Sequence, residues 1–152
     1  MTRSCTNSQT FGWLEGQLKL TTPRHLIIGQ QTIQAVVPHE IFWAIAANQL
    51  NLTRLWKVKP YLQNGVLSHV EIAELPNPRR SSQHGSFFMV GRMTASEPDR
   101  FKLYIADTKT ETLIFGSVPY RYGVGDTLYA KATLKQQSLH LDHCYSHSEL
   151  AQ

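Results

Sequence analysis

The feature that most constrains this chain is an internal repeat, in which four short motifs of the first half recur in the same order in the second. Leu14–Leu18 resembles Met89–Met93, with apolar residues on both sides of a central glycine. The other pairs are Pro23–Leu26 with Pro98–Phe101, Ile33–Pro38 with Ile114–Pro119, and Val58–Leu62 with Ala130–Leu134. The shared order predicts one supersecondary plan used twice. Each copy is small enough that an isolated core would be marginal, so we expect the copies to pack on each other or on a partner.

Composition favours a globular protein in a reducing compartment. The 152 residues are 41% apolar, and 15 Lys and Arg against 11 Asp and Glu give a net charge of +4. This excess fits a polyanionic partner, although an ordinary basic protein remains an alternative. Cys5 and Cys144 form no CxxC pair, and neither a leader nor a membrane-spanning apolar run is visible. We therefore expect a cytoplasmic protein with no membrane partner.

Polar, Pro- and Ser-rich stretches divide the chain. We expect a disordered arm at 1–10, a linker at 76–86 (PNPRRSSQHGS) and a tail at 146–152. The two repeats then occupy 11–75 and 87–145.

Hydrophobic periodicity gives both repeats the same order of elements. In repeat one we expect strands at 12–21, 25–28 and 32–37, a helix over His39–Leu50 that ends at Asn51, and strands at 55–62 and 66–73 around the turn Asn64-Gly65. In repeat two we expect strands at 87–95, 100–106, 112–118, 127–135 and 138–144, with turns at 107–110 and at Gln136-Gln137 and a loop in place of the helix.

Five short strands with a helix or loop between the third and fourth resemble the OB-fold, a small and partly open barrel. Gly16 and Gly91 support the resemblance, because glycine relieves the bend that the first strand of such a barrel must make. The resemblance rests on element order rather than on a diagnostic motif. It implies a mostly β chain with two OB-like five-stranded small barrels in tandem, the first with a helix between strands three and four. A longer meander, a pair of SH3-like barrels and one larger barrel are alternatives.

OB-folds bind single-stranded nucleic acid or oligosaccharide along strands two and three, where aromatic rings stack on bases and cations neutralise phosphates. Period-two geometry in strand 100–106 places Phe101, Leu103 and Ile105 in the core. The outward side chains are then Arg100, Lys102 and Tyr104. An ordinary solvated face with one tyrosine is the alternative interpretation.

The fourth strand of each repeat shows a related pattern. In repeat one the inward residues are Trp56, Val58, Pro60 and Leu62, and the outward ones are Lys57, Lys59 and Tyr61. In repeat two the inward residues are Leu128, Ala130, Ala132 and Leu134, and the outward ones are Tyr129, Lys131 and Lys135. Lysines on exposed strands also prevent edge pairing, so this pattern does not by itself indicate a ligand.

The loop that replaces the helix contains Tyr120, Arg121 and Tyr122, which could clamp a base or a partner or simply cover the end of the barrel. The candidate nucleic-acid-binding residues are therefore Lys57, Lys59, Tyr61, Arg100, Lys102, Tyr104, Tyr120, Arg121, Tyr122, Tyr129 and Lys131. We assign Trp13 and Trp43 to core packing or to packing between the repeats.

One cluster resembles a metal site, because strand geometry would place His140, Asp142 and Cys144 on one face. No second half-site accompanies it, so we expect neither a metal ion nor a cofactor. The sequence holds no GxSxG, GxxxxGK[ST], HExxH or GxGxxG motif, and we expect no enzymatic activity.

The sequence thus favours a module that binds single-stranded DNA or RNA through basic and aromatic strand faces. The alternative is a protein-interaction or self-assembly module, with another protein or copies of itself as the partner. The aromatic-rich helix over His39–Leu50 favours that alternative.

Overall fold

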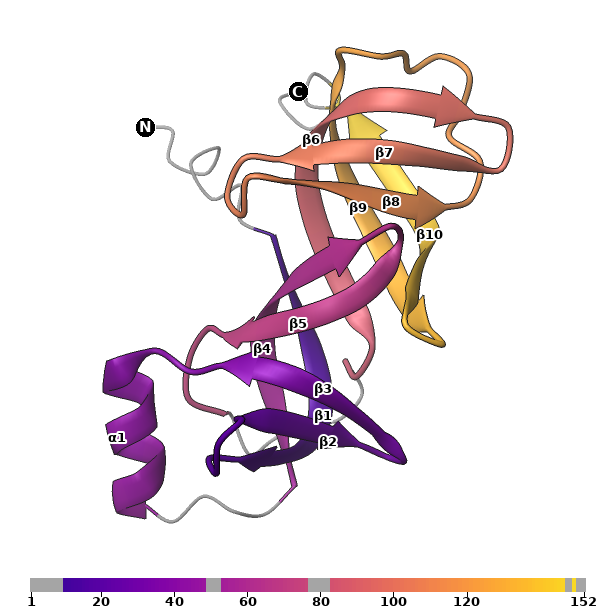
Figure 1. Cartoon of the computed structure of the whole chain (residues 1–152). Coiled ribbons are helices and arrows are strands. Elements are labelled where there is room, and N and C mark those ends of the chain that lie inside the picture. Colours follow the sequence, from indigo (N-terminus) through magenta and orange to yellow (C-terminus); the bar gives the residue numbers. More distant parts are fainter. Residues whose placement is uncertain (1–9, 49–52, 77–82, 147–148, 150–152) are drawn as a thin grey trace. The chain divides into compact units, whose positions relative to one another are not determined.

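The computed structural model describes residues 10–48, 53–76, 83–146 and 149, and most of these lie in β-strands (Figure 1). The chain forms two compact units. The first unit contains Phe11–Tyr61 and Leu67–Ser86. The second contains Leu62–Val66, Phe87–Gln152 and the segment that precedes Phe11.

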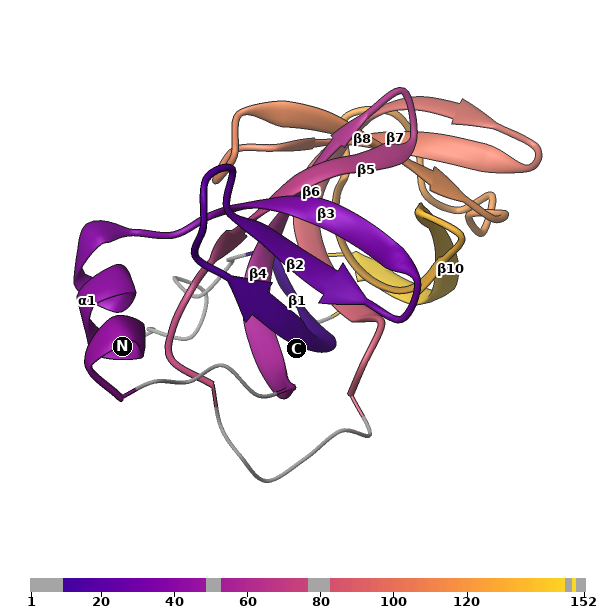
Figure 2. The ribbon, with the colours of Figure 1, turned by 60° about the horizontal axis from the view of Figure 1, so that its bottom comes forward.

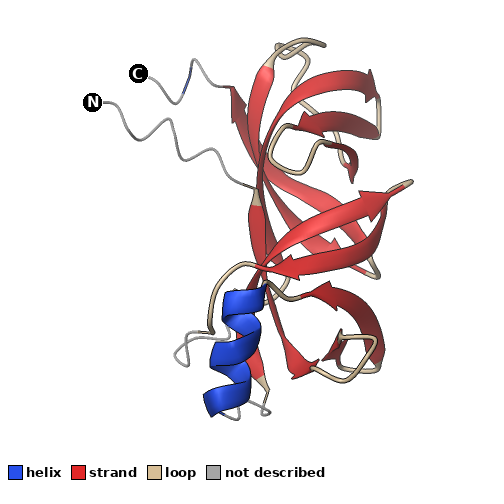
Figure 3. Ribbon diagram, turned by 60° about the vertical axis from the view of Figure 1, so that its left-hand side comes forward, coloured by secondary structure: helices blue, strands red, loops and turns tan. Residues whose placement is uncertain are grey.

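The first unit contains most of a closed five-stranded barrel, whose β4–β5 hairpin ends in the segment Leu62–Val66 that is counted with the second unit. Its elements are β1 (Phe11–Lys19), β2 (His25–Ile28), β3 (Gln31–Val36), α1 (His39–Asn48), β4 (Arg54–Gln63) and β5 (Val66–Ile72). The strands pair in the order β2-β3-β5-β4-β1, and a further pairing of β1 with β2 closes the barrel (Figure 2). The helix, drawn in blue in Figure 3, lies between β3 and β4 in the chain, and β3 runs parallel to β5. The predicted mostly β, OB-like barrel with its helix is therefore confirmed for this unit.

Gly16 allows the first barrel to close. A Cβ atom at this position would lie 2.4 Å from the backbone oxygen of Ile27 on β2, so a side chain would push the two strands apart. The carbonyl of Gly16 also accepts a hydrogen bond of 3.0 Å from the indole Nε1 of Trp56, which is completely buried. The core around this bond includes Leu14, Leu18, Leu26, Ile33, Val58, Val70 and Ile72.

The second unit repeats these pairings strand for strand. Its strands are β6 (Ser86–Glu97), β7 (Arg100–Ile105), β8 (Thr110–Phe115), β9 (Thr127–Lys135) and β10 (Ser138–Ser146). They pair in the order β6-β7-β8-β10-β9 with an additional pairing of β6 and β9, and β8 runs parallel to β10 as β3 does to β5. A Cβ atom on Gly91 would lie 2.6 Å from the backbone oxygen of Tyr104 on β7, as at Gly16. The core includes Phe87, Met89, Met93, Phe101, Leu103, Ile105, Ile114 and Leu139.

The predicted tight turns are confirmed by their backbone conformation. Asn64 and Gly65 have positive φ angles of 53° and 81°, and Gln136 and Gln137 have 53° and 74°. Two consecutive positive φ angles are typical of the hairpin turns whose twist matches that of the flanking strands. The β4–β5 and β9–β10 hairpins are thereby fixed in register.

Some expectations differ from the structure. Trp43 was assigned to packing in the core or between the repeats, but it is 58% exposed on α1, so the core alternative is wrong. Within the predicted linker, His84 Nδ1 accepts a hydrogen bond of 2.8 Å from the backbone N–H of Glu15, and the N–H of Gly85 donates to the carbonyl of Trp13 over 2.7 Å. These two linker residues therefore bind β1.

Several predictions lie outside the described residues. They concern 1–9 of the arm, 77–82 of the linker, most of the tail, and the helix end at Leu50 and Asn51. Thr10, assigned to the arm, is buried, and its hydroxyl oxygen accepts a hydrogen bond of 3.2 Å from the backbone N–H of Val90.

No helix in the described part of the chain is long and apolar enough to cross a membrane.

Candidate nucleic-acid interface

The outward side of β7 carries the predicted cations. Phe101, Leu103 and Ile105 are buried, as expected from period-two geometry. Lys102 and Tyr104 are exposed and Arg100 is half-buried on the other side of the strand. The predicted division of β7 into inward and outward side chains is therefore confirmed.

Strand register places aromatic and apolar residues beside these cations. On β8, Phe115 pairs with Arg100, Leu113 with Lys102, and Glu111 with Tyr104. On β6, Arg92 pairs with Tyr104. We call this surface the β7–β8 face and define it by Arg92, Arg100, Lys102, Tyr104, Glu111, Leu113 and Phe115.

Two cation–aromatic pairs lie on the β7–β8 face. The guanidinium carbon of Arg100 is 5.3 Å from the ring centre of Phe115, and that of Arg92 is 6.0 Å from the ring centre of Tyr104. The Phe115 ring also stacks on His140 of β10, with ring centres 5.5 Å apart and an interplanar angle of 27°. Tyr104 is exposed and can stack on a planar ligand while a phosphate approaches the cation. Phe115 is half-buried and already stacks on His140, so a ligand on this ring would have to replace or extend that contact.

Sequence reasoning missed Phe115, Arg92 and His140. The signal for Phe115 was available, because the predicted turn between the strands fixes which residues face each other. With Ile105 opposite Thr110, each step back along β7 is matched by one step forward along β8, so Arg100 comes to face Phe115.

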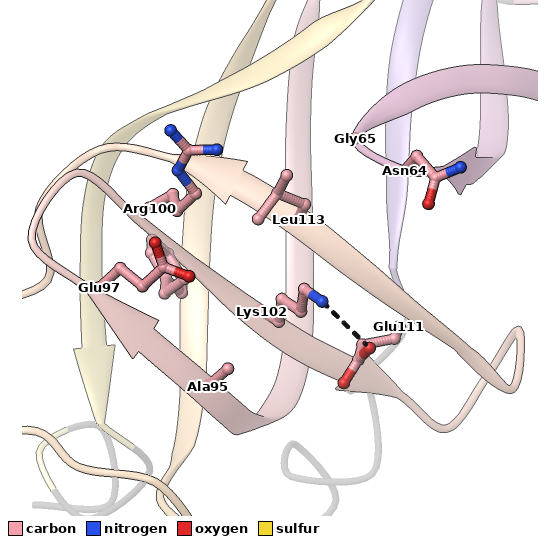
Figure 4. A pocket seen from close by; sticks show the side chains of 9 residues that line it. Asn64, Gly65, Ala95, Glu97, Arg100, Lys102, Glu111 and Leu113 are labelled. Carbon is pink, nitrogen blue, oxygen red and sulfur yellow. Dashed lines mark ion pairs between the residues drawn. The ribbon is translucent and has the colours of Figure 1, made fainter.

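A cavity of about 340 Å³ opens on the β7–β8 face (Figure 4). All of its lining residues belong to the second unit, including Asn64 and Gly65. Lys102 and Glu111 point toward each other at the cavity, with Nζ 3.8 Å from Oε1. The Thr94 hydroxyl donates a hydrogen bond of 2.6 Å to the other oxygen of Glu111. The full lining is Asn64, Gly65, Ala95, Glu97, Arg100, Phe101, Lys102, Glu111 and Leu113.

The charge on this surface is mixed. Arg100 donates two hydrogen bonds of 3.2 Å to the carboxylate of Asp99. These bonds lower the pKa of Asp99 and raise that of Arg100, so both groups stay ionised near neutral pH. Because Asp99 and Glu111 accompany the cations, the face can place a few cations at defined positions but does not form a broad positive patch.

The predicted residues of β4 belong to the first unit, and neighbours contact them. Lys57 Nζ lies 3.9 Å from a carboxylate oxygen of Glu74 and 4.5 Å from the ring centre of Phe11. Tyr61 stacks on His69 with ring centres 4.4 Å apart, and its hydroxyl donates to Glu71 over 3.2 Å. Lys57, Lys59 and Tyr61 are all half-buried, opposite the buried Trp56, Val58, Pro60 and Leu62. Binding a ligand here would require these contacts to be exchanged.

Tyr129 and Lys131 lie on β9, away from the cavity lining, and both are half-buried. They pair with Tyr145 and His143 of β10. The inward assignment of this strand holds for Leu128, Ala130 and Ala132, whereas Leu134 is only half-buried.

The predicted loop residues have separate environments. The Tyr120 side chain is fully exposed, whereas Tyr122 is buried. The Tyr122 hydroxyl donates to Glu149 and accepts a hydrogen bond of 2.8 Å from Arg121, whose Nε lies 3.2 Å from Glu149 Oε2. Loss of water, followed by the bond to Glu149, raises the pKa of Tyr122. Tyr122 and Arg121 therefore both contact Glu149, whereas the Tyr120 ring is exposed to solvent.

Glu149 also forms a reciprocal pair with Ser146. The backbone N–H of Ser146 donates to Glu149 Oε1 over 2.9 Å, and the backbone N–H of Glu149 donates to the Ser146 hydroxyl over 3.2 Å. This is the arrangement of a helix capping box. The hydrogen bond from Tyr122, followed by that from Ser146, lowers the pKa of Glu149.

The proposed common face of His140, Asp142 and Cys144 is wrong. A bulge between Leu141 and His143 shifts the register, which reverses the alternation, so that Cys144 is buried while Asp142 is exposed. Burial raises the pKa of the Cys144 thiol. The described residues contain no group of three or more His, Cys, Asp or Glu side chains that could hold a metal ion.

The comparisons with known proteins give no family for this chain, because neither a family model nor a curated protein matches its sequence.

Proposed function

We propose that this protein binds single-stranded nucleic acid, DNA or RNA, on the β7–β8 face. The observation that carries the proposal is the outward row Arg100, Lys102 and Tyr104 on β7, in which Arg100 faces Phe115 of β8. A base stacked on an aromatic side chain contributes about 1–3 kcal/mol, and neighbouring cations neutralise phosphates. We further propose that the second unit is a second OB-like barrel, in which β7 and β8 are the strands that bind ligands.

The mixed charge of the β7–β8 face supports binding in which stacking matters more than phosphate neutralisation. If Arg100 and Lys102 each neutralise one phosphate, log K should fall with log salt with a slope of about −1.4. A broad positive patch would give a much steeper slope.

The test is a fluorescence anisotropy titration of labelled oligo-dT and oligo-U at low salt, repeated at increasing salt. We expect the double variant R100A/K102A to bind at least about tenfold more weakly and to lose most of its salt dependence. The matched control is K19A/K135A, which changes the net charge equally but leaves the β7–β8 face intact. No binding of either oligonucleotide by the wild type at low salt would refute the proposal.

A second candidate, protein interaction or self-assembly, is favoured by helix α1. Trp43 is 58% exposed, and its ring lies edge-on to Phe42 with centres 5.4 Å apart. Exposed tryptophans are enriched in protein interfaces. A defined oligomer in size-exclusion chromatography with light scattering, indifferent to nucleic acid and dissociated by W43A, would select this candidate.

A cytoplasmic location and the lack of enzymatic activity and of a cofactor remain predictions.

A further inference from the structure

An acidic side chain on a surface that binds a polyanion needs a physical explanation, and Glu111 is such a side chain. It lines the cavity of the β7–β8 face, and its side chain is 47% exposed. A carboxylate at this place weakens the attraction of Lys102 for a phosphate. The group that enters the cavity must therefore offer something to a carboxylate.

An ionised carboxylate only accepts hydrogen bonds, so its partner must be a donor. Proteins that bind single strands read the Watson–Crick edges of unpaired bases. Among the common bases, guanine alone presents two adjacent donors on that edge, N1–H and the 2-amino group, with the acceptor O6 beside them. Adenine and cytosine present one amino group, and uracil and thymine present one N–H.

The Lys102–Glu111 pair has the complementary pattern. The two oxygens of Glu111 can accept from N1–H and the 2-amino group, and the ammonium of Lys102, 3.8 Å from Oε1, can donate to O6. The hydrogen bond from Thr94 holds the carboxylate in one orientation. Thr94 is therefore a positioning residue for Glu111.

Part of the remaining wall fits a flat ring, because Leu113 and Ala95 line the cavity with aliphatic groups. The polar part of that wall comes from Asn64, Glu97 and Arg100. The volume, about 340 Å³, is at the lower end of the range for small-molecule pockets, so it suits one base rather than a large ligand.

We propose that this cavity binds a guanine base of a single strand, with Glu111 and Lys102 as the residues that determine specificity. The inference rests on the proposed function, because the strand must first bind to the β7–β8 face.

The experiment measures anisotropy for labelled 12-nucleotide oligo-dT and for the same strand with one central dG, dA, dC or deoxyinosine. The dG strand should bind at least about fivefold more tightly than the others, as expected of one good bidentate contact. Deoxyinosine lacks the 2-amino group and should lose much of this advantage. In E111Q the preference for dG should disappear, whereas oligo-dT should bind as well as before or more tightly, because a negative charge has been removed.

The matched control is D107N, which removes one negative charge from the turn of the same hairpin without altering the cavity lining. It should keep the preference for dG. Circular dichroism and thermal unfolding of both variants identify any loss of folding. T94V provides a second variant, which removes the hydrogen bond of 2.6 Å to Glu111 together with a longer one of 3.5 Å to the Lys102 carbonyl.

Each outcome decides the inference. Binding of all strands with equal affinity, or a dG preference that survives in E111Q, overturns the guanine site but leaves the proposed function standing. Binding by E111Q when the wild type does not bind shows that Glu111 blocks the face and also overturns the guanine site. The absence of binding by wild type and variants alike refutes the proposed function and the guanine site together.

Discussion

Replacement of Gly16 or Gly91 by alanine should destabilise the unit that contains it, because each first strand closely approaches the backbone of the next. At Gly16 the new Cβ atom would lie 2.4 Å from the Ile27 carbonyl oxygen, and contacts below 3.0 Å are essentially never seen for a Cβ atom. The strands must therefore separate by at least about 0.6 Å, which strains the ladder that pairs β1 with β2 from Gln17 to Lys19. Overpacking of this kind costs about 1–3 kcal/mol.

The first assay is urea unfolding of G16A followed by tryptophan fluorescence. Trp56 reports directly on the perturbed site, because its indole donates to the Gly16 carbonyl. The variant G91A is followed by circular dichroism, and its expected loss is of the same size, since its Cβ atom would lie 2.6 Å from the Tyr104 carbonyl oxygen.

The matched control is G123A, because a Cβ atom on Gly123 would meet nothing within 4 Å. Its free energy of unfolding should stay within about 1 kcal/mol of wild type. If G16A and G91A are as stable as G123A, the explanation that close backbone approach requires glycine at these two positions is refuted.

Three further predictions concern side chains. F115A should weaken binding of oligo-dT about tenfold in anisotropy titrations, because a stacking ring is lost; unchanged affinity would remove Phe115 from the interface. The pKa of Glu149 is lowered in the folded protein, so the ionised Glu149 side chain stabilises the fold. This stabilisation is fully present at pH values above the ordinary pKa of about 4.5 and is lost as the pH falls through the lower pKa of the folded state. The difference in Tm between wild type and E149Q should therefore be present at pH 7 and vanish in acid, and equal Tm values at pH 7 would contradict this. Acrylamide should quench the wild type more than W43F, because Trp43 is exposed and Trp56 is buried; equal quenching would place Trp43 in a contact.

Much of the fold was predictable from local signals. The turn residues Asn64-Gly65 and Gln136-Gln137 marked two hairpins, and the Pro-terminated strand before His39 marked the start of a helix. The glycines of the first strands were expected to relieve a bend, and the structure adds a second reason, the approach of a neighbouring carbonyl. That contact depends on strand pairing, which periodicity along one strand does not specify.

The candidate site was only partly predictable for the same reason. Alternation along β7 identified Arg100, Lys102 and Tyr104 as outward residues, because burial follows a period of two. The partners of outward residues depend on neighbouring strands, so Tyr61 was expected to be available although it bonds to Glu71. The bulge after Leu141 inserts one residue and reverses the alternation, which no count along β10 could reveal. Trp43 was assigned to packing in the core or between the repeats, but its side chain is exposed on α1.

The most direct test of the central claim is a ¹H–¹⁵N NMR titration of the labelled protein with an unlabelled 12-nucleotide single strand. We predict that the backbone amide shifts change most within 100–105 of β7 and 110–115 of β8, and much less in α1. Changes centred on α1, or no changes on β7 and β8 at saturating strand concentration, would contradict the assignment of the β7–β8 face as the nucleic-acid interface.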